Sequence, residues 1–113
     1  MARAATTSDT FNAVAEPRRR DILNCLASEE RAVGDIVVKL GLEQPSVSKH
    51  LGVLRRVGLV RVRRHGRHMF YRANGDAIRP MYEWTKTFEP LWQHQLKNVK
   101  ERAEAKQKLL DNS

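Results

Sequence analysis

The stretch that most constrains this chain is VGDIVVKLGLEQPSVSKHLGVLRRVG, residues 33–58. Its first segment carries an apolar face made by Ile36, Val37 and Leu40, spaced as on one side of a helix. Gly41 follows, and glycine takes the positive φ that a tight turn after a helix requires. This order predicts a short helix that ends at a sharp turn.

The second segment begins at Gln44 or Pro45 and is also helical in pattern. Its apolar residues recur every three or four positions and form one face: Val47, Leu51, Leu54 and Val57. Ser46, Ser48 and Lys49 lie off that face, near the helix start, where short polar side chains suit base edges. Two helices joined in this way are typical of a helix-turn-helix, whose second helix enters the major groove of DNA.

Charge and length agree with this interpretation. The chain has 113 residues, enough for one domain, and its 21 Lys and Arg against 13 Asp and Glu give a formal charge of +8 and a pI near 10.3. Such an excess favours a polyanionic partner, with nucleic acid first and an anionic membrane surface second. No apolar run approaches the roughly 18 residues of a membrane span, and no signal peptide is visible. We therefore expect a soluble cytoplasmic protein, bound to the nucleoid when it binds DNA.

The N-terminal part contains two predicted helices. Residues 1–7 are small and polar and are expected to be disordered, and a helix from Ser8 or Asp9 ends near Ala15. Pro17 suits the first turn of the next helix. The arginines at positions 18–20 then form a basic cluster, which is either a phosphate contact, an ion pair with a nearby carboxylate, or a solvated turn.

A β-hairpin is predicted after the second helix. Residues 59–64 alternate apolar and basic side chains, residues 65–67 make a turn, and residues 69–72 return with Tyr71 pointing inward. From Asn74 the pattern is helical to about Leu110, and Pro90 is expected to kink or split that helix. We place the folded domain at residues 8–96 and a charged helix end and tail at residues 97–113.

The last helix is rich in large apolar side chains that have little of their own chain to pack against. A second copy of the chain would cover them, so we expect a homodimer that binds a roughly palindromic operator. The alternative is a monomer whose last helix folds back on its own domain. The predicted interface consists of Phe11, Val14, Trp84, Phe88, Leu91 and Trp92.

Three segments together resemble the ArsR/SmtB family of winged helix-turn-helix repressors. They are AEPRRRDILNCL, QPSVSKHLGVLRRVGLV and RRHGRHMFYRAN, which match the family's opening helix, recognition helix and wing. The similarity runs from about Phe11 to Asn74, with looser agreement to Trp92. It implies a mainly α fold with a small β-hairpin, and a dimeric DNA-binding regulator, usually a repressor of its own promoter that an inducer releases.

The resemblance places the groove-reading residues on the recognition helix, and side-chain chemistry supports it. Gln44 can pair with adenine, the two serines with bases or phosphates, and Lys49 with guanine or the backbone, although Gln44 could serve only as a cap and Ser48 could be half-buried. His50 is more often structural at such a position. The complete predicted DNA-binding set, wing included, is Gln44, Ser46, Ser48, Lys49, Arg63, Arg64, His65 and Arg67.

Other functions find less support. The thiolate pair and the histidine-rich motif that metal-sensing members carry are missing, so we expect no metal and no cofactor. Cys25 is interpreted as a buried thiol, and His65 with His68 would make a weak zinc site. No motif of an enzyme is present. Two alternatives remain open: a protein-interaction module that acts through the C-terminal helix, and a metal- or redox-sensing repressor that uses Cys25 or the wing histidines.

Overall fold

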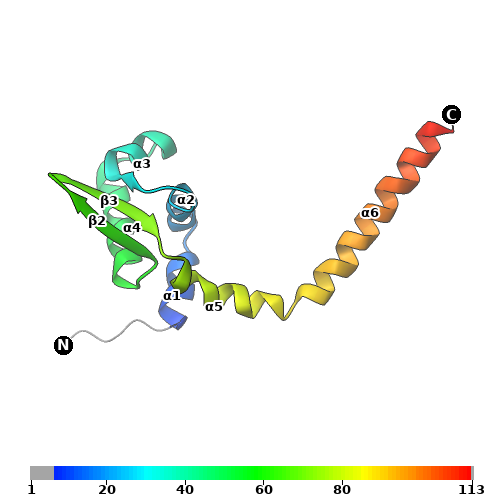
Figure 1. The fold of residues 1–113 in the computed structure, drawn as a ribbon, viewed down its shortest axis with the longest axis horizontal. Helices are drawn as coiled ribbons and strands as arrows, with labels where there is room; N and C mark the ends of the chain where they lie inside the picture. Colours follow the sequence, from blue (N-terminus) through cyan, green and yellow to red (C-terminus); the bar gives the residue numbers. More distant parts are fainter. Residues whose placement is uncertain (1–6, 113) are drawn as a thin grey trace. The chain divides into compact units, whose positions relative to one another are not determined.

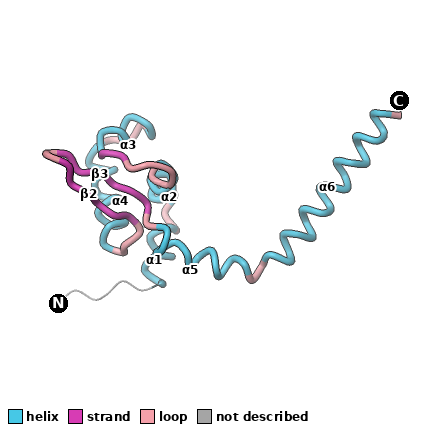
Figure 2. The backbone as a smooth tube through the Cα atoms, viewed as in Figure 1, coloured by secondary structure: helices cyan, strands magenta, loops and turns pink. Residues whose placement is uncertain are grey.

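The computed structural model describes residues 7–112, so the stretch expected to be disordered lies outside the described residues except for Thr7. The elements, in chain order, are α1 (Thr7–Val14), α2 (Pro17–Cys25), β1 (Arg31–Ala32), α3 (Val33–Leu40), α4 (Gln44–Arg56), β2 (Val60–His65), β3 (His68–Ala73), α5 (Gly75–Lys86) and α6 (Glu89–Asp111) (Figures 1 and 2). This composition confirms the predicted mainly α class with a β-hairpin. The chain divides into two compact units between Pro80 and Met81. The predicted boundary between residues 96 and 97 stays a prediction.

The core of the first unit lies between α2, α3, α4 and the start of β2, which pack on one another (Figure 1). The predicted inner face of α4 is confirmed, because Val47, Leu51 and Leu54 are at most 1% exposed. Burying each such side chain stabilises the fold by roughly 1.5–3 kcal/mol. The other fully buried large side chains are Ile22, Leu26, Ile36 and Leu59. Because this face of α4 is packed in the core, the other face of α4 is directed toward solvent.

The turn between α3 and α4 has the predicted form. Gly41 has a φ of 64°, and its N–H donates to the Val37 carbonyl at 2.9 Å. The Leu42 N–H donates to the same carbonyl at 3.3 Å, which closes the end of α3 as in a Schellman-type cap. Glu43 precedes α4 in an extended conformation but forms no side-chain cap hydrogen bond. The turn therefore relies on glycine and backbone hydrogen bonds.

The hairpin is one part of a three-stranded antiparallel sheet with the order β1-β3-β2. β2 and β3 are joined by a two-residue turn at Gly66 and Arg67, and Gly66 has a φ of 63°. In the register, Val62 lies opposite Tyr71, so the half-buried Tyr71 shares the inner face with the apolar residues of β2 as predicted. β1 was not predicted, because two residues are too short to show an alternating pattern.

The base of the hairpin is tied to the helices by hydrogen bonds. The Asn74 side-chain amide donates to the Gly58 carbonyl at 2.8 Å, and its backbone N–H donates to the Leu59 carbonyl at 2.8 Å. The Ala73 N–H donates to the Leu26 carbonyl at 3.1 Å. These three bonds fix where the wing leaves the domain.

The basic cluster at the start of α2 has a structural use that the sequence pattern did not reveal. Arg19 Nε donates to the Ala13 carbonyl at 2.6 Å, and Arg20 donates to the Val14 carbonyl at 2.8 Å. Both guanidinium groups therefore satisfy carbonyls at the end of α1, where cations are favourable to the helix dipole. Arg18 lies 3.8 Å from Asp21, which agrees with the ion-pair alternative for that residue.

The second unit is helical. Pro90 accompanies a split rather than a kink, because α5 ends at Lys86 and α6 begins at Glu89 with the proline in its first turn. Proline is tolerated there, since the first helical N–H groups have no intrahelical acceptor. α6 continues as a helix through the charged segment to Asp111. Of the helices described, none combines the length and apolar character needed to cross a membrane.

Candidate nucleic-acid interface

The outward face of α4 carries most of the predicted groove-reading residues. Gln44, Ser48 and Lys49 are exposed, whereas Ser46 is half-buried. Within residues 7–112, none of these four side chains has a hydrogen bond or an ion pair. The structure thus favours Ser48 over Ser46 as an accessible residue, opposite to the sequence-based expectation that Ser48 could be half-buried.

Two further basic residues extend this face. Arg55 and Arg56 are exposed in the last turn of α4, seven residues after Ser48 and Lys49 respectively. Seven residues are close to two helical turns, so each arginine lies on the same side of the helix as its earlier counterpart. Their position also suits the helix dipole. The spacing was visible in the sequence, but both residues were absent from the predicted set.

The tip of the hairpin carries the predicted wing residues. Arg64, His65, Arg67 and His68 are all exposed, and His65 lies directly opposite His68 across the strands. Arg67 occupies the turn itself, beside Gly66. Arg64 and Arg67 make no ion pair within the described chain, so their charges are available to a partner.

Arg63 differs from its neighbours on the wing. Its guanidinium group forms two hydrogen bonds with the Glu30 carboxylate, at 3.1 and 2.5 Å, and lies 5.3 Å from the centroid of the Phe70 ring. The hydrogen bond from Arg63 lowers the pKa of Glu30, and the same bond raises the pKa of Arg63. Arg63 is therefore held by an intramolecular partner, which its sequence neighbourhood did not indicate.

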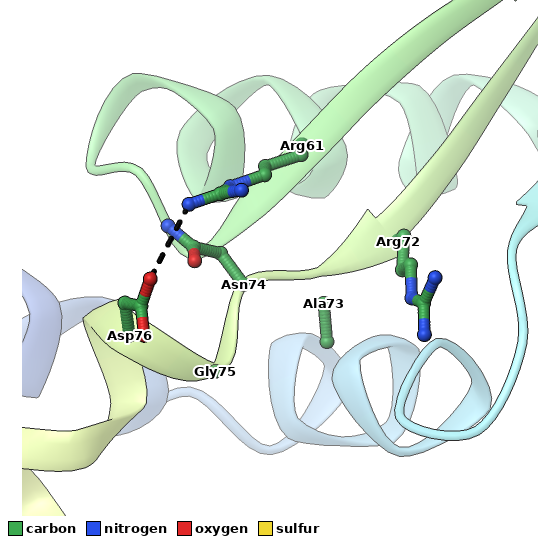
Figure 3. A pocket seen from close by; sticks show the side chains of 6 residues that line it. All are labelled: Arg61, Arg72, Ala73, Asn74, Gly75 and Asp76. Carbon is green, nitrogen blue, oxygen red and sulfur yellow. Dashed lines mark ion pairs between the residues drawn. The ribbon is translucent and has the colours of Figure 1, made fainter.

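A small polar pocket of about 300 Å³ lies at the base of the wing (Figure 3). Arg61 and Arg72 occupy paired positions on β2 and β3, and Arg61 lies 3.5 Å from the Asp76 carboxylate. The remaining lining residues are Ala73, Asn74 and Gly75. Like charges opposite each other on a sheet are unfavourable, so Asp76 offsets part of the repulsion between the two arginines.

His50 lies on the inner side of α4 rather than on the outward face. Its side chain is 14% exposed, and Nε2 lies 4.0 Å from the Glu16 carboxylate. Glu16 also accepts a hydrogen bond from the Arg19 N–H at 3.0 Å and so caps α2. His50 Nδ1 is buried without a hydrogen-bond partner in the described chain. This placement agrees with a structural histidine, although the expected hydrogen bonding is incomplete.

Cys25 is buried at the end of α2, with 6% of its surface exposed, as expected for a packed thiol. Within residues 7–112, no three side chains of His, Cys, Asp or Glu come together in a group that could hold a metal ion. The residues predicted for a dimer interface are accessible. Phe11 and Val14 are half-buried on α1, and the exposed aromatic and aliphatic side chains of the second unit are Trp84 (56%), Phe88 (36%), Leu91 (62%) and Trp92 (44%).

Comparison with known proteins agrees with this geometry. Residues 16–62, from the cap of α2 into β2, match the family model described as "Bacterial regulatory protein, arsR family". The chain is 42% identical over 68 residues to the nodulation protein NolR of Rhizobium meliloti, a match that covers 60% of this chain but only 56% of NolR. It is 36% identical over 81 residues to the biofilm growth-associated repressor of Agrobacterium fabrum, covering 72% of this chain and 69% of that protein.

A solved structure is similar as well. It is the homodimeric winged helix-turn-helix DNA-binding domain of Mb0332 from Mycobacterium bovis, a possible ArsR-family transcriptional regulator. The match has a TM-score of 0.62 and 32% identity, and it covers 73% of this chain and 77% of that one. This likeness confirms the predicted winged helix-turn-helix fold.

Proposed function

This chain belongs to the ArsR family of bacterial regulatory proteins, and from that premise we propose that it is a dimeric, sequence-specific DNA-binding repressor. Family membership makes it a transcriptional regulator and not an enzyme. The observation that carries the proposal is the outward face of α4, where exposed polar and basic side chains lie without partners in residues 7–112. Side chains of these types at the start of a helix read base edges in the major groove.

In this proposal, α4 and the wing contact different parts of the DNA. Gln44, Ser48 and Lys49 contact base edges, and Ser46 contributes at the margin of the groove. Arg64 and Arg67 of the wing contact phosphates or the minor groove, with His65 beside them. Arg63 takes part to the extent that DNA competes with Glu30 for its guanidinium group. Phosphate contacts set affinity and register, whereas α4 sets the sequence preference.

The dimer is proposed on the exposure of large apolar side chains. Trp84, Leu91 and Trp92 are 56%, 62% and 44% exposed in the single chain, which is costly for residues of that size. A homodimeric relative with the same fold supports a second copy as their cover. Two recognition helices would then meet major grooves about 34 Å apart on a roughly palindromic operator. We place the protein in the cytoplasm, at the nucleoid when bound, and the operator near its own promoter.

The experiment that tests the proposal replaces Lys49 and Arg67 together with alanine. Both side chains are exposed and without partners in the described chain, so the fold and the dimer should be unaffected. Binding to a duplex that the wild-type protein enriches from a randomised library should be abolished. Sedimentation and circular dichroism of the variant serve as controls. Unchanged DNA affinity would overturn the proposal and favour a protein-interaction module that acts through the exposed apolar residues of α6.

A further inference from the structure

Gly52 lies near the middle of the exposed face of α4. At about 100° per residue, the core-facing Leu54 lies about 160° from Gly52 around the helix, and the core-facing Leu51 lies about 100° from it. At roughly 100° per residue, Ser48 and Arg55 fall to one side of Gly52, and Lys49 and Arg56 fall to the other. Gly52 therefore lies at the centre of the face of α4 that contacts DNA in the proposed function.

The fold of this chain gives no reason for a glycine at this position. Apart from its two chain neighbours and the adjacent backbone of α4 itself, a Cβ atom built on Gly52 has no heavy atom within 4 Å. Its φ is not positive, since the glycines with positive φ are Gly41, Gly58 and Gly66. Glycine is also among the least favourable residues in a helix interior, second only to proline. The chain thus carries an unfavourable residue in the middle of α4 without any packing benefit within the described part.

The surroundings of Gly52 identify what approaches it. Lys49 lies about one turn before it and Arg56 about one turn after it, so two cations bracket the bare position along the helix. Neither forms an ion pair with residues 7–112, and neither does Arg55. A position without a side chain, lying between cations that have no ion pair in the described chain, suits contact with a polyanion and not contact with an apolar protein surface.

We propose that Gly52 sets the depth at which α4 seats in the major groove of its operator. A helix with its side chains is about 10–12 Å across, and the major groove is about 12 Å wide, so a side chain in the middle of the exposed face would hold the helix away from the groove floor. With no side chain there, Ser48 and Lys49 reach base edges while Arg55 and Arg56 reach phosphates. This inference rests on the proposed DNA binding and adds Gly52, Arg55 and Arg56 to the interface.

The test uses the full chain with G52A and G52L, because alanine and leucine are both strong helix formers. G52A should raise Tm by about 4 °C or more, since it removes the helix penalty of glycine. It should nevertheless raise Kd about tenfold for the duplex that the wild-type protein enriches from a randomised library, the equivalent of one lost charged hydrogen bond. G52L should raise Kd further, by about a hundredfold.

The control is G34A on α3. Gly34 is also exposed and helical, and a Cβ there likewise meets nothing within 4 Å, so this variant should leave Kd within about twofold of the wild type. Wild-type affinity in both Gly52 variants would overturn the inference and leave the proposed function standing. A fall in Tm, or loss of the dimer in sedimentation, would also overturn it, because glycine would then serve the fold or the subunit interface. Failure of the wild-type protein to bind any duplex would overturn the proposed function as well.

Discussion

The salt dependence of DNA binding should distinguish Arg67 from Arg63, although both are exposed arginines of the wing. Arg67 has no ion pair within residues 7–112, whereas Arg63 is hydrogen-bonded to Glu30. A phosphate contact releases condensed counterions, and each contact adds about 0.9 to the slope of log K against log salt. R67A removes one contact per protomer and two per dimer, so the slope should become less steep by about 1.8. Between about 50 and 200 mM salt, the loss of affinity should then be about tenfold smaller than for the wild type.

The matched variant is E30Q/R63Q, which removes both members of the existing ion pair and leaves the formal charge unchanged. Because the pair is already neutralised within the chain, the slope should stay within about 0.5 of the wild-type value. Fluorescence anisotropy titrations of a labelled duplex at four or more salt concentrations measure both slopes. An equal decrease in the two variants would refute the reasoning, since Arg63 would then leave Glu30 to bind phosphate in the complex.

Three further predictions concern the fold, its pH dependence and the subunit interface. Leu51 is 1% exposed, so L51A should lower the free energy of unfolding in urea by about 2–5 kcal/mol, and a loss below about 1 kcal/mol would contradict the described core. The hydrogen bond from Arg63 lowers the pKa of Glu30 below its ordinary 4.5. The wild type should therefore have a larger free energy of unfolding than E30Q at neutral pH, and this difference should disappear as the pH falls through the folded-state pKa of Glu30. A difference that does not change with pH would contradict this prediction. W84A/L91A should sediment as a monomer where wild type and the control L109A are dimers, and a dimeric W84A/L91A protein would exclude the proposed interface.

The central part of the fold was predictable from the sequence because it is specified locally. The bounds of α3 agree with the predicted segment, and α4 begins at Gln44, one of the two predicted starts. Both results follow from the helical spacing of apolar residues and from a single glycine whose positive φ ends α3. The hairpin was found for a similar reason, since its strands alternate in pattern and flank a short turn with glycine.

The features that sequence reasoning missed depend on contacts between distant segments or on which side of a helix faces the core. Glu30 and Arg63 are 33 residues apart in the sequence, and no local sequence pattern predicts that they pair. The hydrogen bonds from Arg19 and Arg20 to the end of α1 depend on how two helices meet. Ser46 and Ser48 differ by about 200° around α4, so deciding which of them is accessible requires the packed structure. The sequence pattern gives no sign that Gly52 is unusual, and only the structure shows that a side chain would fit there.

The most direct test of the account is a footprint of the purified full chain on DNA immediately upstream of its own coding sequence. A dimer whose two recognition helices bind the major groove should protect two related half-sites. Their centres should be separated by one helical turn of DNA, about 34 Å, or by a multiple of that distance. K49A/R67A should leave the same DNA unprotected at equal protein concentration. Protection of two such half-sites by the wild-type protein alone is the predicted result. A single, unpaired protected site, or the same protection by K49A/R67A, would contradict the account.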